Sequence, residues 1–189
     1  MRTILIASAF HKEGRTTTAQ GLAFASAILR PSKQILLVDA DFRNPSLHCI
    51  LSRKERPGLL DLIGGDVNEA SDCYQRSELP NLTVMTAGGT SGGEVTGLFR
   101  GEAVMGCLQN AKERFDLAFY DSPPVREYLD ALYLSRIVDT VLMVVRPKIS
   151  RLDEVISARN DIHHAGGKVI GLIMNDFRNP IPSFLAKHL

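Results

Sequence analysis

The chain has 189 residues, and its 22 basic and 21 acidic side chains leave a formal net charge of +1. This balance gives no reason to expect bulk binding to nucleic acid or to a membrane surface, and no apolar run approaches the roughly 20 residues that span a bilayer. Apolar residues make up 44% and charged residues 23%, which excludes a disordered chain. The three cysteines have no CxxC spacing, which favours reduced thiols in a cytoplasmic protein.

Short apolar runs alternate with helix-like segments along the chain. Strands are predicted at 3–7, 34–38, 82–85, 117–120, 140–145 and 168–174, and helices at 16–29, 95–114, 129–136 and 152–164. The strand runs are continuously apolar, which indicates strands buried on both faces. Their alternation with helices predicts a three-layer α/β/α domain over 1–176 with a mainly parallel sheet. We interpret 44–80 as a surface excursion with one short helix near 59–63, and 177–189 as a tail.

The segment between the first strand and the first helix has the composition of a phosphate-binding loop. Its residues 13–17 read E-G-R-T-T. Backbone N–H groups at such a helix start can hold phosphate oxygens, and a threonine hydroxyl can ligate Mg²⁺. The G-x-x-x-x-G-K-[ST] pattern fails twice, because Ala9 replaces the first glycine and Arg15 replaces the lysine. Taken alone, the segment is more typical of an ordinary loop capped by threonine.

Polar residues also follow four later strands, at the sheet edge where parallel sheets bind ligands. Asp39 and Asp41 leave the second strand, and Asp121 closes the strand at 117–120 in a Walker-B arrangement. Such carboxylates can hold the water ligands of Mg²⁺ or accept a proton from a hydroxyl, although each alone is more often a turn or cap residue. Asn175 has an amide that suits an adenine edge. Arg146 suits either a ligand phosphate or ribose, or a pair with an acid.

In this order the motifs resemble the cytoplasmic P-loop domain of the bacterial tyrosine kinases of capsule and exopolysaccharide synthesis, which are relatives of the deviant-Walker partitioning ATPases. The resemblance covers about 3–175 and rests on the strings LLVDADFRNPSLH, PGLLDLIGG, LPNLTVMTAG, FDLAFYDSPPV, DTVLMVVRP and VIGLIMND. It implies a P-loop NTPase fold, ATP and Mg²⁺ as cofactors, and transfer of the γ-phosphate to tyrosine in the control of polysaccharide chain length. It also implies a cytoplasmic location and a membrane partner of the polysaccharide chain-length (co-polymerase) type.

The resemblance further implies roles for single residues. The residues expected to contact the nucleotide are Lys12, Glu13, Gly14, Arg15, Thr16, Thr17, Arg146 and Asn175. The residues expected around Mg²⁺ are Thr16, Asp39, Asp41 and Asp121. The expected catalytic residues are Asp39, Asp41 and Arg15. One of the two aspartates would organise Mg²⁺ and its water, and the other would activate the tyrosine hydroxyl; the sequence does not divide these roles.

The chain departs from the family pattern in four places: the phosphate loop, the start of the chain, its end, and residues 89–93. Arg15 replaces the loop lysine, and because a guanidinium is larger and planar we expect weaker binding and slower transfer. His11 and Lys12 replace Pro-Gly, so that Lys12 can return a positive charge to the loop. The chain starts at the first strand without the family's arginine-bearing helix, and no tyrosine follows Asn175. A glycine-rich stretch at 89–93 replaces Pro-Pro-Asn-Pro.

Three functions stay open at this point. The first is a tyrosine kinase of polysaccharide production. The second is a non-catalytic relative that keeps the fold and acts as a regulatory partner in polysaccharide export, which the exchanged lysine and the missing tyrosines favour. The third is a partitioning-type ATPase, which would carry an additional early lysine that Ala9-Phe10 lacks.

Overall fold

The protein is described by a computed structural model over residues 2–54, 57–89 and 102–177. Its centre is a seven-stranded sheet in the order β3-β4-β2-β5-β1-β6-β7. The strands are β1 (Thr3–Ala7), β2 (Ile35–Asp39), β3 (Tyr74–Arg76), β4 (Leu82–Met85), β5 (Leu117–Asp121), β6 (Thr140–Val145) and β7 (Val169–Met174). All neighbouring pairs are parallel except β3 with β4. The predicted α/β class with a mainly parallel sheet is confirmed.

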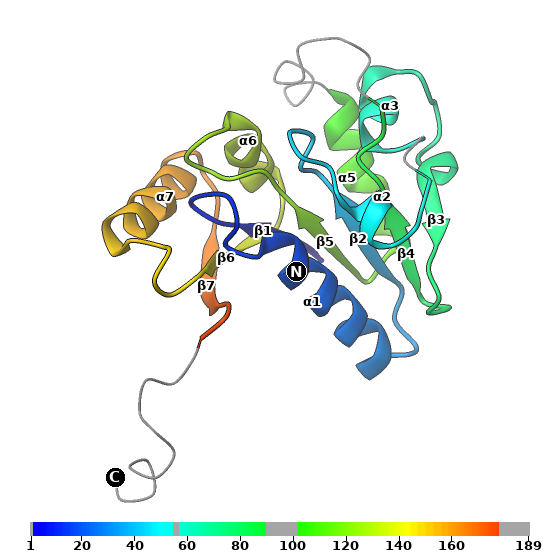
Figure 1. The fold of residues 1–189 in the computed structure, drawn as a ribbon. Coiled ribbons are helices and arrows are strands. Elements are labelled where there is room, and N and C mark those ends of the chain that lie inside the picture. The colour runs from blue at the N-terminus through cyan, green and yellow to red at the C-terminus, as the bar shows by residue number, and fades with distance from the viewer. Residues whose placement is uncertain (1, 55–56, 90–101, 178–189) are drawn as a thin grey trace, which may run out of the picture.

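Helices cover both faces of this sheet (Figure 1). They are α1 (Arg15–Leu29), α2 (Leu47–Ile50), α3 (Leu59–Gly64), the 3₁₀ turn η1 (Ala70–Cys73), α5 (Glu102–Arg114), α6 (Leu129–Ile137) and α7 (Leu152–His164). Alternate residues of β1 point to opposite faces. Ile4 and Ile6 therefore pack in one cluster with α1, while Leu5 packs in the other with α5, α6 and α7.

The helix α1 lies close to the sheet because small residues recur on its buried side. Ala19, Ala23 and Ala27 stand at intervals of four, which places them on one face of the helix. The end of α1 is fixed by a side chain from the turn before β4. Asn81 Nδ2 donates to the carbonyl oxygens of Ala27, Arg30 and Lys33 at 3.0, 3.2 and 2.9 Å, and so satisfies carbonyls that a helix end leaves open.

The segment 44–80 is more than the surface excursion that its sequence predicts. Its two short helices and η1 bury Leu47, Leu59, Leu60 and Cys73 in the two core clusters. The sequence also misses β3, whose Tyr-Gln-Arg has no apolar signal and which forms only by antiparallel pairing with β4.

The prediction that the strands are buried on both faces is wrong for β7. Its Ile170, Leu172 and Met174 are 47%, 56% and 57% exposed. They alternate with half-buried residues, so one face of this edge strand is open and only the other packs on the core. The first part of the predicted long helix (95–101), most of the glycine-rich stretch (90–93) and the tail from 178 onward lie outside the described residues. No helix within the described ranges is long and apolar enough to cross a membrane.

Candidate functional site

The carboxyl ends of the three central strands bring the predicted motifs together. In the sheet, β5 pairs with both β1 and β2, and Asp121 stands in register with Ile6 on one side and Asp39 on the other. The loop that leaves β1, residues 8–14, therefore lies at the same edge as the two aspartates. We call it the phosphate loop. Three segments that are distant in sequence form one site at this edge of the sheet.

The phosphate loop makes a tight turn into α1. Gly14 has φ 97°, a left-handed conformation that favours glycine, and the Thr18 N–H donates to its carbonyl oxygen at 2.9 Å to begin the helix. The Phe10 N–H donates to the Glu13 carboxylate at 2.8 Å and closes the turn. A Cβ on Gly14 would lie 1.9 Å from Asn175 Nδ2, so a larger residue would displace the Asn175 amide as well as strain the backbone.

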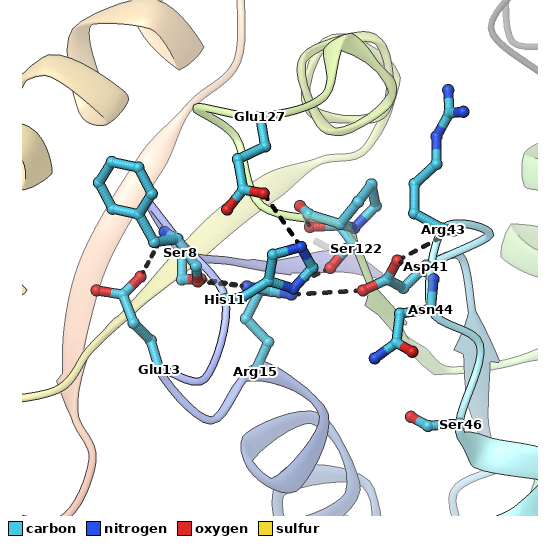
Figure 2. Close-up of polar contacts among 12 residues, drawn as sticks. Ser8, His11, Glu13, Arg15, Asp41, Arg43, Asn44, Ser46, Ser122 and Glu127 are labelled. Atoms are coloured by element: carbon cyan, nitrogen blue, oxygen red, sulfur yellow. Dashed lines mark hydrogen bonds and ion pairs between the residues drawn. The ribbon is translucent and has the colours of Figure 1, made fainter. Parts of the chain in front are cut away.

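Arg15 is turned inward, beneath the loop. Its side chain is 6% exposed, and its guanidinium donates to Ser122 O and Phe10 O at 2.8 Å and to Ser8 Oγ. It also pairs with Asp41 Oδ2 at 3.4 Å, as Figure 2 shows. The guanidinium is thus held by four acceptors of the protein itself. Contacts of this kind must loosen before the same donors can turn to a ligand.

Both predicted catalytic acids at the carboxyl end of β2 are engaged by backbone groups. Asp39 is fully buried, and its oxygens accept the N–H groups of Asp41, Ser46 and Leu47 at 3.2, 3.0 and 2.9 Å. Burial raises the pKa of Asp39 to about 6, although these hydrogen bonds oppose the rise. Asp41 Oδ1 accepts the N–H groups of Arg43 and Asn44 at 3.3 and 3.1 Å, which leaves Oδ2 for Arg15.

Asp121 differs from the other two acids. It is fully buried, and neither of its oxygens has a hydrogen-bond partner that meets ordinary geometry within the described part of the chain. Burial raises the pKa of Asp121 to about 8, against the lowering effect of the nearby Thr16 hydroxyl. A buried carboxylate with open lone pairs at a phosphate loop fits a role beside a divalent cation, which would favour its ionised form.

The predicted metal residues do not form a complete protein cage. No group of three or more His, Cys, Asp or Glu side chains among the residues that the structure describes is arranged to hold a metal ion. This fits Mg²⁺ rather than excludes it, because Mg²⁺ usually keeps waters and binds through one or two carboxylates and the phosphates of its substrate. Asp121 and the half-buried Thr16 are the residues present that suit this arrangement.

The remaining predicted residues surround the loop. Thr17 and Lys12 are exposed, Lys12 with φ 64°. Arg146 pairs with Asp176 Oδ2 at 2.8 Å and donates to the Lys12 carbonyl oxygen at 3.2 Å. Of the two contacts expected for Arg146, with a ligand or with an acid, the structure shows the pair with an acid. Asn175 Nδ2 donates to the Glu13 carbonyl oxygen at 3.0 Å, so its amide reaches the loop from the end of β7.

Sequence reasoning missed several groups that shape the site. Ser8 and Ser122 supply acceptors to Arg15. Ser150 donates to the Glu13 carboxylate. His11 Nε2 lies 3.2 Å from Glu127 Oε2 and connects the loop to the segment after β5 (Figure 2). Single serines and a lone His carry no sequence signal, because only the tertiary contact gives them their meaning.

No family model matches the chain. Among curated proteins it is 32% identical over 164 residues to EpsB of Ralstonia nicotianae, which is provisionally named a tyrosine-protein kinase; the match covers 84% of this chain and 22% of the relative. It is 26% identical over 175 residues to the tyrosine-protein kinase YwqD of Bacillus subtilis, covering 93% and 72%. It is 29% identical over 181 residues to ExoP of Rhizobium meliloti, a succinoglycan biosynthesis transport protein, covering 92% and 22%. The chain thus spans about a fifth of the length of EpsB and ExoP.

Solved structures agree with these relatives. The chimerical protein CapA2B2 superposes with a TM-score of 0.87 at 26% identity, over 94% of this chain and 77% of that one. The septum site-determining protein MinD of Pyrococcus horikoshii, solved with Mg-ADP, gives a TM-score of 0.76 at 22% identity, over 99% and 76%, and shows the shared fold. The sequence and the fold together identify this chain as a homologue of the P-loop domain of the bacterial tyrosine-protein kinases.

Proposed function

We propose that the chain binds ATP with Mg²⁺ and transfers the γ-phosphate to tyrosine, in the control of bacterial capsule or exopolysaccharide synthesis. The observation that carries the proposal is the convergence of the phosphate loop with Asp39 and the buried Asp121 at one sheet edge. The oxygens of Asp121 have no hydrogen bond of ordinary geometry to any residue that the structure describes. The names of EpsB, YwqD and ExoP support the kinase activity and the polysaccharide context. A membrane protein of polysaccharide export is the expected partner.

The residues would share the work as follows. Lys12, Thr17 and the N–H groups of the phosphate loop would hold the phosphates at the start of α1. Thr16 and Asp121 would hold Mg²⁺, which neutralises phosphate charge when bound. Asp39 is occupied by three backbone N–H groups and would fix the chain near the metal. Asp41 would then accept the proton of the tyrosine hydroxyl.

The test is incubation with γ-labelled ATP, Mg²⁺ and a Glu-Tyr copolymer, alongside calorimetry of ATP binding. Asp121→Asn should weaken Mg²⁺-dependent ATP binding by about tenfold or more, as removal of a metal-site group usually does. Burial disfavours the ionised carboxylate, and no hydrogen bond of ordinary geometry is lost among the described residues, so the variant's stability against urea should not fall. Asp72→Asn, at an exposed carboxylate in η1, is the matched control. Native magnesium dependence in Asp121→Asn would overturn the assignment.

A second candidate is a relative that binds nucleotide without transfer and acts as a regulatory partner. The specific observation in its favour is the Arg15 guanidinium, which occupies the underside of the loop and pairs with Asp41. With that pair intact, Asp41 Oδ2 is engaged by the guanidinium and is less accessible to a tyrosine hydroxyl. Measurable ATP binding with no phosphotyrosine on the copolymer would support this candidate over the kinase.

A further inference from the structure

The outer side of the phosphate loop is held by the segments that follow β6 and β7. The Glu13 carboxylate has no exposed surface, and both oxygens are used. Oε2 accepts the Phe10 N–H at 2.8 Å, and Oε1 accepts the hydroxyl of Ser150. The Ser150 Oγ in turn accepts the Arg146 N–H at 2.8 Å. A continuous chain of hydrogen bonds therefore connects the loop to the end of β6.

Two more contacts reinforce this connection from the same side. Asn175 Nδ2 donates to the Glu13 carbonyl oxygen, and Arg146 Nη1 donates to that of Lys12. The partners lie more than 130 residues away in sequence. The contacts from Asn175 and Arg146 are both made to carbonyl oxygens, so they fix the backbone of the loop and not its exposed side chains.

A buried carboxylate beside a site for anions is unfavourable unless it has a compensating structural role. Glu13 has such compensation in its two hydrogen bonds. In Figure 2 its carboxylate points away from the Arg15 guanidinium, on the other side of the loop. Glu13 therefore acts on the shape of the loop and does not face a ligand held above α1.

We propose that Glu13 and Ser150 are positioning residues, which together fix the curvature of the phosphate loop so that its N–H groups converge on phosphate before the nucleotide arrives. This inference deepens the proposed nucleotide site and rests on it. Its physical basis is preorganisation: a loop already held in its binding shape loses less conformational freedom when the ligand binds. It also makes the β6–α7 connection part of the nucleotide-binding apparatus.

The first experiment needs no nucleotide. Amide hydrogen exchange of the ligand-free full chain measures protection of the Phe10 N–H in the native protein and in Ser150→Ala. Loss of the hydroxyl should free the Glu13 carboxylate and speed Phe10 exchange about tenfold. Ser150→Thr keeps a hydroxyl and should restore native exchange, and Ser71→Ala, at an exposed serine of η1 beside the opposite sheet edge, should change nothing. Unchanged Phe10 exchange in Ser150→Ala would overturn the proposal.

The second experiment measures ATP affinity with Mg²⁺ by calorimetry for the same variants. Ser150→Ala should raise the Kd about fivefold to tenfold, with recovery in Ser150→Thr, because the loop must now be ordered by the ligand. Faster Phe10 exchange with an unchanged Kd would refute the positioning role and leave a structural contact only. Failure of the native chain to bind ATP would refute the proposed function, while the exchange result would still report on the Glu13–Ser150 contact.

Discussion

The Arg15→Lys variant tests whether the buried Arg15 guanidinium competes with a nucleotide for the phosphate loop. The arginine reaches four acceptors at once: Ser8 Oγ, Phe10 O, Ser122 O and Asp41 Oδ2. A lysine ammonium is a compact point charge and cannot reproduce the planar fork that spans them. We count the loss of two charged hydrogen bonds at about 1.5–3 kcal/mol each, and allow for partial recovery through lysine's own donors. The free energy of unfolding should therefore fall by about 2–4 kcal/mol.

The same variant should bind nucleotide more tightly. If phosphates compete with the four protein acceptors for the Arg15 donors, then breaking those contacts opposes binding in the native chain. Relief of about 1.4 kcal/mol of that opposition lowers the Kd tenfold. Stability and affinity should thus change in opposite directions, which a general loosening of the fold would not produce.

Urea unfolding and calorimetry with ATP and Mg²⁺ measure the two quantities. Arg76→Lys is the matched control, because Arg76 is exposed in β3, at the sheet edge away from the phosphate loop. It should alter neither result. A less stable Arg15→Lys protein whose ATP affinity stays the same or falls would refute the idea that the guanidinium competes with phosphate. Unchanged stability would show that its buried contacts contribute little.

Three further predictions concern stability. Although partial burial opposes it, Lys112 and two backbone N–H groups at the start of the chain hold the pKa of Asp139 below its usual range. Its contribution to stability should therefore be complete at neutral pH, begin to fall below about pH 4, and be lost only as the pH passes through the depressed pKa. Asp139→Asn should accordingly lose about 1–2 kcal/mol in urea at pH 7 and progressively less as the pH is lowered from about 4 towards the depressed pKa, and a loss that does not shrink with pH would contradict this. Gly167→Ala should destabilise the protein by about 1–3 kcal/mol, because the new Cβ would lie 2.7 Å from neighbouring side-chain atoms. Gly106→Ala, in open space within α5, should instead stabilise it by about 0.5–1 kcal/mol. Equal melting temperatures for the two variants would count against this reasoning. Asn81→Asp removes three donor contacts at the end of α1. It should lower the urea midpoint by the equivalent of about 2 kcal/mol or more. An unchanged midpoint would show that these contacts are dispensable for stability.

The order of the elements and the edge of the sheet that carries the site could be predicted from the sequence. The strands at 3–7, 82–85 and 140–145 have their predicted bounds, because continuous apolar runs bounded by polar turns are a local signal. The acids at strand ends were also predictable as neighbours, since parallel strands bring their carboxyl ends to one edge. The composition of β3, in contrast, is polar, and only its pairing with β4 makes it a strand.

The properties that distinguish the site residues were decided by the tertiary structure alone. The sequence does not distinguish Asp39, Asp41 and Asp121. In the structure the first two are engaged by backbone N–H groups or Arg15, whereas the buried oxygens of Asp121 have no hydrogen bond of ordinary geometry to the residues that are described. The inward turn of Arg15 depends on Ser122, 107 residues away. Local pattern specifies burial and periodicity, whereas hydrogen-bond partners depend on where distant segments pack, and that information is carried by the folded chain as a whole.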